Sequence, residues 1–285
     1  MNMNGKTVLI TGASSGIGLE ASVKLARMGA HVVMVARSRK KGESVLEDIK
    51  QRSGSGAVEL LLCDFSSQAS IRALAAEFRS KYSRLDVLID NAGGVNSGRR
   101  TTVDGLEQTF AVNHLGYFLL TTLLLDMLER SAPSRVVITA SRAHLRGDLE
   151  FDNLQFEKGG YSIMRAYSRS KLCNVLFSNE LARRMASKGV TVNCLHPGVV
   201  ATNIWGGPLP SLLGKAVGWV LKPFMITPEQ GGDRIVYLAA SPEVEGKTGG
   251  YYDKDRLVEQ APLAREANVA KRLWDVSAEL VADRK

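Results

Sequence analysis

Short apolar runs alternate with longer segments of helical periodicity through most of this chain. The runs are rich in Val, Ile and Leu, which is typical of strands, and the segments between them repeat apolar residues at helical spacing. Strands separated by helices pair in parallel, and continuous apolar runs indicate strands buried on both faces. The pattern predicts an α/β fold with a doubly wound parallel sheet. Strands are expected at 6–12, 31–37, 57–65, 85–94, 135–141 and 190–198, with helices near 17–29, 39–52, 67–82, 104–130 and 162–187.

The domain organisation follows from what the 285 residues lack. No internal repeat, low-complexity tract or Pro/Gly/Ser-rich linker divides the sequence. We therefore expect a single domain over 1–285, with a C-terminal helical extension at about 262–281.

Charge and cysteine usage exclude several classes of protein. The formal net charge is +8, but the basic residues are scattered among acidic ones and are not interleaved with aromatic residues, so no nucleic-acid partner is expected. Cys63, Cys173 and Cys194 lie inside apolar runs without metal-ligand spacing, which predicts buried, reduced thiols, a cytoplasmic protein and no metal site. No apolar run reaches about 18 residues, so the chain is expected to be soluble or to lie on a membrane surface.

Three glycines follow the first predicted strand directly. Gly12, Gly16 and Gly18 stand in "TGASSGIG", at the mouth of the first predicted helix. Glycines in this place let the backbone turn tightly and approach a pyrophosphate, which binds the free N–H groups of the helix N-terminus. The spacing is Gly-x-x-x-Gly-x-Gly, so the position between a strand and a helix, more than the spacing, favours dinucleotide binding over a purely structural turn.

The end of the second predicted strand indicates which dinucleotide is bound. An acidic residue there would bind a ribose 2′-hydroxyl, whereas this chain has Ala36 and then Arg37, with Arg39, Lys40 and Lys41 close behind. A guanidinium presents a planar fork to a phosphate. The basic residues therefore favour the 2′-phosphate of NADP(H) over NAD, and the alternative is a solvated basic turn.

Tyr167 and Lys171 stand four residues apart in a segment predicted to be a helix. Residues at this spacing share one helix face, so the ammonium can lie beside the phenol. A neighbouring cation is expected to lower the pKa of the phenol and so make it a usable proton donor and acceptor. Taken alone, the pair is also common by chance.

Further motifs occur in a fixed order. They are "DNAGG" at 90–94, Asn113 in "AVNHLGYF", Ser141 in "VVITAS", "YSRSK" from Tyr167 and "HPGVVAT" at 196–202. With "TGASSGIG", they resemble the motifs of the short-chain dehydrogenase/reductase family over about residues 6–252. Three other segments, "NLQFEKGGY", "KLCNVLFSNELARR" and "RLWDVSAEL", resemble its retinol-dehydrogenase-like branch, and protochlorophyllide reductase is a more distant relative. The resemblance implies a Rossmann-type fold.

The resemblance also implies a role for each motif residue. Tyr167 would transfer the proton to or from the substrate oxygen, and Lys171 would lower the pKa of Tyr167 and hold the nicotinamide ribose. Ser141 would donate a hydrogen bond to the same oxygen. Asn113 would hold a water that links Lys171 to solvent, and its alternative is an Asn that bonds its own helix backbone.

The cofactor-binding positions carry over in the same way. Asp64 and Phe65 would lie at the adenine, and Asn91, Ala92 and Gly93 would pass the backbone near the adenosine ribose, although Asn91 can equally be structural. Pro197, Gly198, Val200 and Thr202 would line the nicotinamide end. Ser14, Ser15 and Ile17 belong with Gly12, Gly16 and Gly18 to the phosphate turn, and Arg37 would bind the 2′-phosphate.

The chain departs from the family pattern between Ser141 and Tyr167. The two are 26 positions apart, roughly twice the common gap, so an insertion is expected to loop out, where it can cover the helix face through which many members pair. His144 close to Ser141 raises the alternative of a Ser/His hydrolase. We disfavour it, because no acidic partner has a defined relation to His144 and Ser141 does not stand in a nucleophile elbow.

The sequence thus predicts an NADP(H)-dependent oxidoreductase that reduces carbonyls or oxidises alcohols, with apolar aldehydes or ketones as substrates by branch resemblance. The alternative is a non-catalytic NADP(H)-binding sensor or scaffold. A lid-like segment is expected at about 203–226, where the apolar run 212–226 is interrupted only by Lys215 and Lys222. It would close over an apolar substrate and touch a membrane peripherally, or simply pack against the domain. Monomer and homodimer both stay open.

Overall fold

The computed structural model describes residues 1–198 and 226–282. The predicted lid-like segment therefore lies outside the described residues except for Ile226, as do Val200 and Thr202.

The described residues form one sheet of eight strands in the order β3-β2-β1-β4-β5-β6-β7-β8. Every pair is parallel except the last, in which β8 runs antiparallel to β7. In register, Leu9 of β1 lies between Val33 of β2 and Leu88 of β4. The strands are β1 Thr7–Thr11, β2 His31–Ala36, β3 Val58–Leu62, β4 Val87–Asp90, β5 Ser134–Thr139, β6 Val190–His196, β7 Tyr251–Asp253 and β8 Arg256–Leu257.

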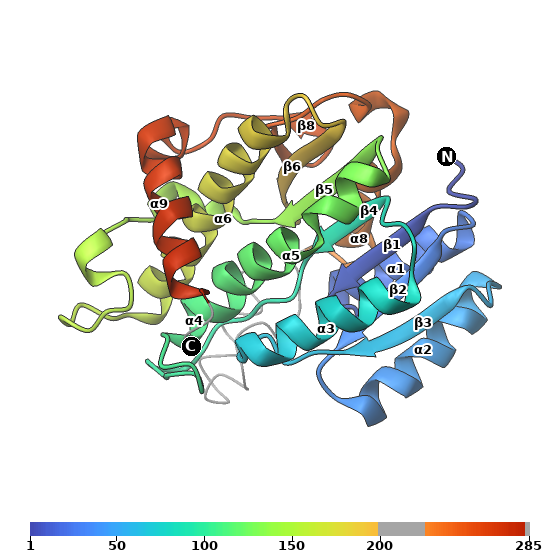
Figure 1. Cartoon of the computed structure of the whole chain (residues 1–285), viewed down its shortest axis with the longest axis horizontal. Helices are drawn as coiled ribbons and strands as arrows, with labels where there is room; N and C mark the ends of the chain where they lie inside the picture. Colours follow the sequence, from blue (N-terminus) through green and yellow to red (C-terminus); the bar gives the residue numbers. More distant parts are fainter. Residues whose placement is uncertain (199–225, 283–285) are drawn as a thin grey trace.

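Helices cover both faces of this sheet (Figure 1). One layer consists of α1 Gly16–Arg27, α2 Arg39–Ser53 and α8 Pro228–Ala240, and the other of α3 Gln68–Lys81, α5 Gly116–Arg130 and α6 Ile163–Met185. A short α4, Gln108–Phe110, leads through a π-helical turn, Ala111–Leu115, into α5. The shorter elements are the 3-10 helices η2 Arg142–Arg146, η3 Phe151–Asn153, η6 Pro242–Val244 and η7 Pro262–Arg265, and the last helix is α9 Ala267–Leu280.

The core is divided by the sheet into two apolar clusters. Along β1, Leu9 packs into the cluster beneath α3, α5 and α6, while Val8 and Ile10 pack into the cluster beneath α1 and α8. All three are fully buried. This alternation follows from the two-residue period of a strand, and it explains why the strands read as continuous apolar runs. The predicted doubly wound parallel sheet is confirmed.

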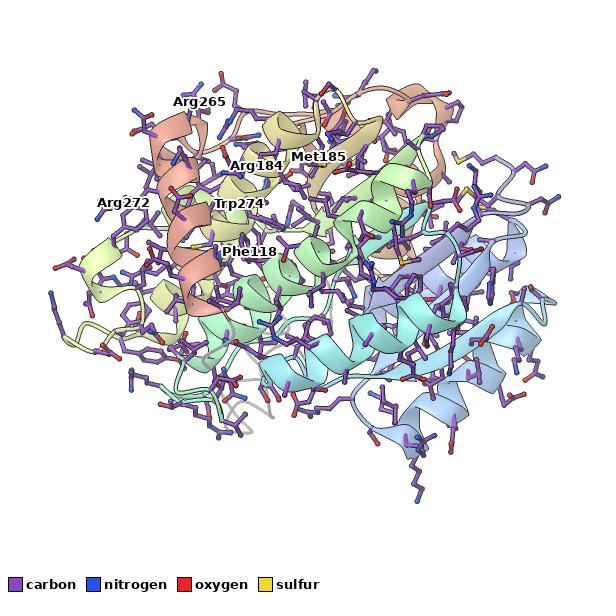
Figure 2. All side chains as sticks on the ribbon, in the orientation of Figure 1. Phe118, Arg184, Met185, Arg265, Arg272 and Trp274 are labelled. Atoms are coloured by element: carbon purple, nitrogen blue, oxygen red, sulfur yellow. The ribbon has the colours of Figure 1, made fainter. Side chains whose placement is uncertain are left out.

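The C-terminal helix α9 packs on α6 through Trp274 (Figures 1 and 2). The indole ring lies edge-on to Phe118 of α5, with ring centroids 4.9 Å apart, and the guanidinium carbon of Arg184 lies 4.1 Å from the Trp274 ring centroid. His114, in the turn before α5, adds a buried hydrogen bond of 2.9 Å between its Nε2 and the Ser277 hydroxyl. Helix α9 thus covers this part of α5 and α6, while the covering of a pairing face by the insertion stays a prediction.

Replacing Trp274 by Ala is expected to destabilise the fold by about 2 kcal/mol, below the range for a fully buried tryptophan because this side chain is only half-buried. The matched control is Asp275→Ala on the exposed side of α9, which removes only a surface pair with Lys271. Urea denaturation measures both free energies of unfolding. Equal values for the two variants would show that α9 contributes little to the fold.

Sequence patterns missed α8, β7 and β8. The start of α8 carries a capping box, in which the Thr227 hydroxyl accepts from the Gln230 backbone N–H and the Gln230 side chain accepts from the Thr227 N–H. The sequence "TPEQ" contains this signature, with Pro at the first helical position, and could have predicted the helix. The strands β7 and β8 are two or three residues long, too short for a periodic signal.

Among the described residues, one helix is long and apolar enough to cross a membrane, the continuous helix Gln108–Arg130 with a mean hydropathy of 1.3 over its most apolar window. Of that window, 72% is buried inside the protein, as in the core helix of a globular fold. Cys63, Cys173 and Cys194 are free and buried, as expected.

Candidate active site

A cavity of about 480 Å³ opens at the carboxyl ends of the central strands. It lies where the strand order reverses between β1 and β4, the usual place for a ligand in a doubly wound sheet. Most residues singled out in the sequence line it: Gly12, Ser14, Ser15, Gly16, Ile17, Arg37, Asp64, Phe65, Asn91, Ala92, Gly93, Asn113, Ser141, Tyr167, Lys171, Pro197 and Gly198. Gly18 is not among the lining residues.

The glycines of the first turn are required for two different reasons. Gly12 and Gly16 have φ of 67° and 58°, in the left-handed region that favours glycine. Gly18 has no such φ, but a Cβ there would lie 2.5 Å from the Gly12 carbonyl oxygen and 2.6 Å from the Asn91 side chain. Gly18 therefore permits close packing behind the turn, while Gly12 and Gly16 shape the wall of the cavity.

The N-terminus of α1 is the part of the cavity suited to an anion. Its N-cap residue Ser15 makes no side-chain capping bond, whereas Ser38, Ser67, Ser162 and Thr227 cap α2, α3, α6 and α8. The first turn of α1 carries no acidic residue. Free N–H groups and the positive end of the helix dipole thus face the cavity beside Ser14 and Gly16, an arrangement that fits a pyrophosphate.

Asn91 holds the two central strands together at this edge. Its Nδ2 donates to the Thr11 carbonyl at 3.0 Å, and its backbone N–H donates to the Thr11 hydroxyl at 2.8 Å. The same hydroxyl accepts from the Ala92 N–H at 2.9 Å. The side chain of Asn91 is thus structural, and its partner is Thr11. The sequence motifs did not predict a role for Thr11.

Arg37 and Asp64 lie at the ends of β2 and β3. Arg37 is exposed and lines the cavity, while its basic neighbours Arg39, Lys40 and Lys41 are exposed but are not among the described lining residues. Nη1 of Arg39 lies 3.7 Å from Oε1 of Glu43. In Asp64, Oδ1 accepts from both the N–H and the hydroxyl of Ser66, which fixes the carboxylate at the cavity wall.

Tyr167 on α6 and Ser141 at the end of β5 meet at the inner part of the cavity. Burial raises the pKa of Tyr167 above its ordinary value, and a hydrogen bond with the Ser141 side chain opposes the rise. The expected lowering by Lys171 is therefore wrong for the protein alone, because desolvation of the phenol is the largest effect. At neutral pH Tyr167 is a protonated phenol, the form that can donate a proton.

Lys171 is buried between two tyrosine rings. Its Nζ lies 5.7 Å from the ring centroid of Tyr167 and 5.9 Å from that of Tyr117, and it donates to the Thr139 carbonyl at 2.9 Å. Burial lowers the pKa of Lys171 to about 7. Burial therefore disfavours the charged ammonium, as it disfavours the charged phenolate of Tyr167. Thr139 and Tyr117 are contacts that helical spacing alone could not reveal.

Asn113 lies in the π-helical turn before α5 and uses its side-chain amide fully. Its Oδ1 accepts from the Gly94 N–H and its Nδ2 donates to the Gly94 carbonyl, both at 2.9 Å. Nδ2 also donates to the Ser170 hydroxyl at 3.1 Å. The amide of Asn113 thus joins the loop after β4 to α6. Neither the water-holding role nor a bond to its own helix backbone had predicted these contacts. A π-turn is a frequent feature of functional sites.

His144 does not activate Ser141. Its Nδ1 donates to the backbone carbonyl of Ser141 at 2.7 Å, and its Nε2 accepts from the Ala261 N–H at 3.1 Å. Both ring nitrogens are therefore occupied by backbone groups, and burial lowers the pKa of His144. The geometry excludes the Ser/His hydrolase, in which the ring would bond the serine hydroxyl.

The insertion between Ser141 and Tyr167 is tied to α6 by Arg169. This side chain is 1% exposed, donates to the Asn153 carbonyl at 2.6 Å and pairs with Asp148 at 3.0 Å. Its guanidinium carbon lies 4.0 Å from the ring centroid of Phe156. Arg169, two residues after Tyr167, was missed because an arginine in a helix gives no signal of burial without knowledge of its partners.

Comparison with known proteins assigns this chain to a family. The model of the short chain dehydrogenase family matches residues 6–208, so the chain belongs to the short-chain dehydrogenase/reductase family, whose members are oxidoreductases that use nicotinamide cofactors. Within that family it falls in the retinol-dehydrogenase-like branch. It is 43% identical to human retinol dehydrogenase 14 over 98% of this chain and 87% of that protein, and 41% identical to human retinol dehydrogenase 13 over 97% and 85%.

Solved structures share the fold. An uncharacterized protein from Mycobacterium paratuberculosis is 31% identical with a TM-score of 0.79, over 98% of this chain and 94% of that chain. A Beutenbergia cavernae structure, described as an NAD(P)-dependent gluconate 5-dehydrogenase with NADP bound at low occupancy, is 25% identical with a TM-score of 0.71, over 89% and 96%.

Proposed function

We propose that this protein is an NADP(H)-dependent oxidoreductase that interconverts apolar aldehydes or ketones and their alcohols. The observation that carries the proposal is the meeting of Ser141, Tyr167 and Lys171 in the same cavity as the α1 N-terminus and Arg37. A proton-transfer group and an anion-binding turn in one cavity are what dehydrogenase chemistry requires.

The described residues of the cavity suit the pyrophosphate, the 2′-phosphate and the adenine of NADP(H). The uncapped N-terminus of α1 would bind the pyrophosphate, Arg37 the 2′-phosphate and Asp64 the adenine. Pro197 and Gly198 would lie at the nicotinamide end, where we also place Val200 and Thr202 from the sequence motif. When bound, the nicotinamide would supply or accept the hydride.

In the reduction, Tyr167 would donate its phenolic proton to the carbonyl oxygen as the carbonyl carbon gains the hydride, leaving an alcohol and a phenolate. Ser141 would donate a hydrogen bond to the same oxygen, where negative charge develops. Lys171 would stabilise the phenolate, since an opposite charge nearby favours the ionised form. Asn113 would act by fixing the loop after β4 against α6 beside Lys171.

The substrate class rests on the branch of the family. Relatives at about 40% identity over nearly the whole chain are named as retinol dehydrogenases, and retinol is a long apolar alcohol. We place the protein in the cytoplasm, with a peripheral membrane contact as an extension of that proposal. The preference for NADP(H) is supported by Arg37 and by the neighbour that contains NADP.

A panel of carbonyl compounds tests the proposal. Purified protein is mixed with NADPH or NADH and with aliphatic aldehydes, retinal, quinones or steroid ketones, and the loss of nicotinamide absorbance is followed. We expect turnover with NADPH, faster for long apolar aldehydes than for small polar ones. Tight binding of one NADPH per chain without turnover on any compound would favour a sensor or scaffold instead.

A further inference from the structure

The two cavity-lining turns at the inner end of the site are not joined by the sheet. The last backbone hydrogen bond between β5 and β6 runs from the Ala140 N–H to the Leu195 carbonyl at 2.9 Å. Ser141 and Pro197 lie just beyond this hydrogen bond, where the segments that follow β5 and β6 separate. Their relative position must therefore be fixed by side chains.

Asp253, at the carboxyl end of β7, stands between these two turns. In the sheet its neighbour on β6 is His196, the residue before Pro197. Its side chain is 12% exposed, and each carboxylate oxygen faces a different arginine. Oδ2 lies 2.8 Å from Nε of Arg142, and Oδ1 lies 3.7 Å from Nη1 of Arg234.

Each of the two arginines adjoins or contacts one of the two turns. Arg142 follows Ser141 directly, and its backbone N–H donates to Nδ1 of His196 at 3.4 Å. Arg234 on α8 donates to the His196 carbonyl at 3.4 Å, and its guanidinium packs so closely on Gly198 that a Cβ there would lie 2.8 Å from Nη1. Asp253 thus connects the Ser141 turn, through Arg142, with the Pro197–Gly198 turn, through Arg234.

We infer that Asp253 is a positioning residue, which fixes the hydrogen-bond donor Ser141 relative to the wall that holds the nicotinamide end of the cofactor. The inference rests on the proposed function. Hydride transfer is sensitive to displacements of about 1 Å, so a carboxylate shared by two turns can control the rate without touching the substrate. Neutralising Asp253 would leave Arg142 and Arg234 close together without their shared partner.

The test is the variant Asp253→Asn, with Asp255→Asn as its matched control, because Asp255 is exposed on the turn between β7 and β8. Single-turnover oxidation of NADPH is measured by stopped flow with saturating retinal or another reactive aldehyde from the panel. A loss of folded protein lowers only the amplitude, whereas a change of position lowers the rate constant. We expect a rate constant about tenfold lower for Asp253→Asn, and an unchanged one for Asp255→Asn.

A parental rate constant in Asp253→Asn would overturn the inference. Should that variant not fold, Arg142→Leu replaces a side chain that is 69% exposed and removes one of the two links, so the rate constant should also fall. A parental rate constant in Arg142→Leu would then overturn the inference. The parent protein is measured first. Absence of any reaction in the parent would refute the proposed function, whereas a reaction in the parent leaves the variants to test the role of Asp253.

Discussion

Replacing Tyr167 by Phe is expected to lower kcat by about 10²–10⁴-fold, the usual contribution of a positioned general acid or base. The ring remains, so its contacts with Lys171 and the shape of the cavity remain, and only the transferable proton is lost. NADPH affinity should stay within a few-fold of the parent. Steady-state kinetics and fluorescence titration of NADPH measure the two effects separately.

The control for this variant is Tyr161→Phe, which removes the same group from a tyrosine outside the lining of the cavity. It should retain parental turnover. Lys171→Met should reduce both turnover and NADPH affinity, since the proposal gives Lys171 a role in each. A Tyr167→Phe enzyme that works at rates close to the parent would show that Tyr167 is not the proton donor.

Arg37→Asp is expected to weaken NADPH binding by about 100-fold. Loss of hydrogen bonds from a charged group costs about 1.5–3 kcal/mol, or one to two decades in affinity, and the new carboxylate adds repulsion against a 2′-phosphate. NADH affinity should hold or improve, because a carboxylate at this place can accept from a 2′-hydroxyl. Titration of both cofactors against parent and variant gives the four dissociation constants.

Lys40→Asp is the matched control, with the same change of charge three positions along the chain at an exposed residue outside the described lining. Its effect on NADPH should be small and should disappear at high salt. Equal affinities of the parent for NADPH and NADH would contradict the assignment of Arg37.

The positions of the central strands and of the glycine turn could be predicted because both depend on local patterns. Runs such as 31–37 and 57–65 predicted β2 and β3 to within a few residues, since strands buried on both faces are continuously apolar. Gly12 and Gly16 follow the first strand so closely that the turn and its place at the helix N-terminus could be recognised together.

What the sequence could not provide were contacts across large distances in the chain. Arg169 reads as an ordinary helical arginine until Asp148 and Phe156 fold over it. Asp253 gains its partners Arg142 and Arg234 only when η2, α8 and β7 come together at one edge of the sheet.

The prediction of a lowered pKa for Tyr167 was wrong for a related reason. Helical spacing correctly placed Lys171 beside the phenol, but burial of both groups decides their pKa values. Burial depends on the whole fold, including the packing of α6 against β5 and β6, and no four-residue spacing contains it.

Transfer of deuterium from NADPH tests the central claim most directly. The purified protein is incubated with NADPH deuterated at both C4 positions of the nicotinamide and with retinal or another aldehyde on which the parent turns over, and the alcohol is analysed by mass spectrometry. The proposed function predicts one deuterium at the former carbonyl carbon of every product molecule, with product formation abolished in Tyr167→Phe. Unlabelled alcohol, or stoichiometric binding of NADPH with no alcohol formed from any carbonyl of the panel, would contradict it.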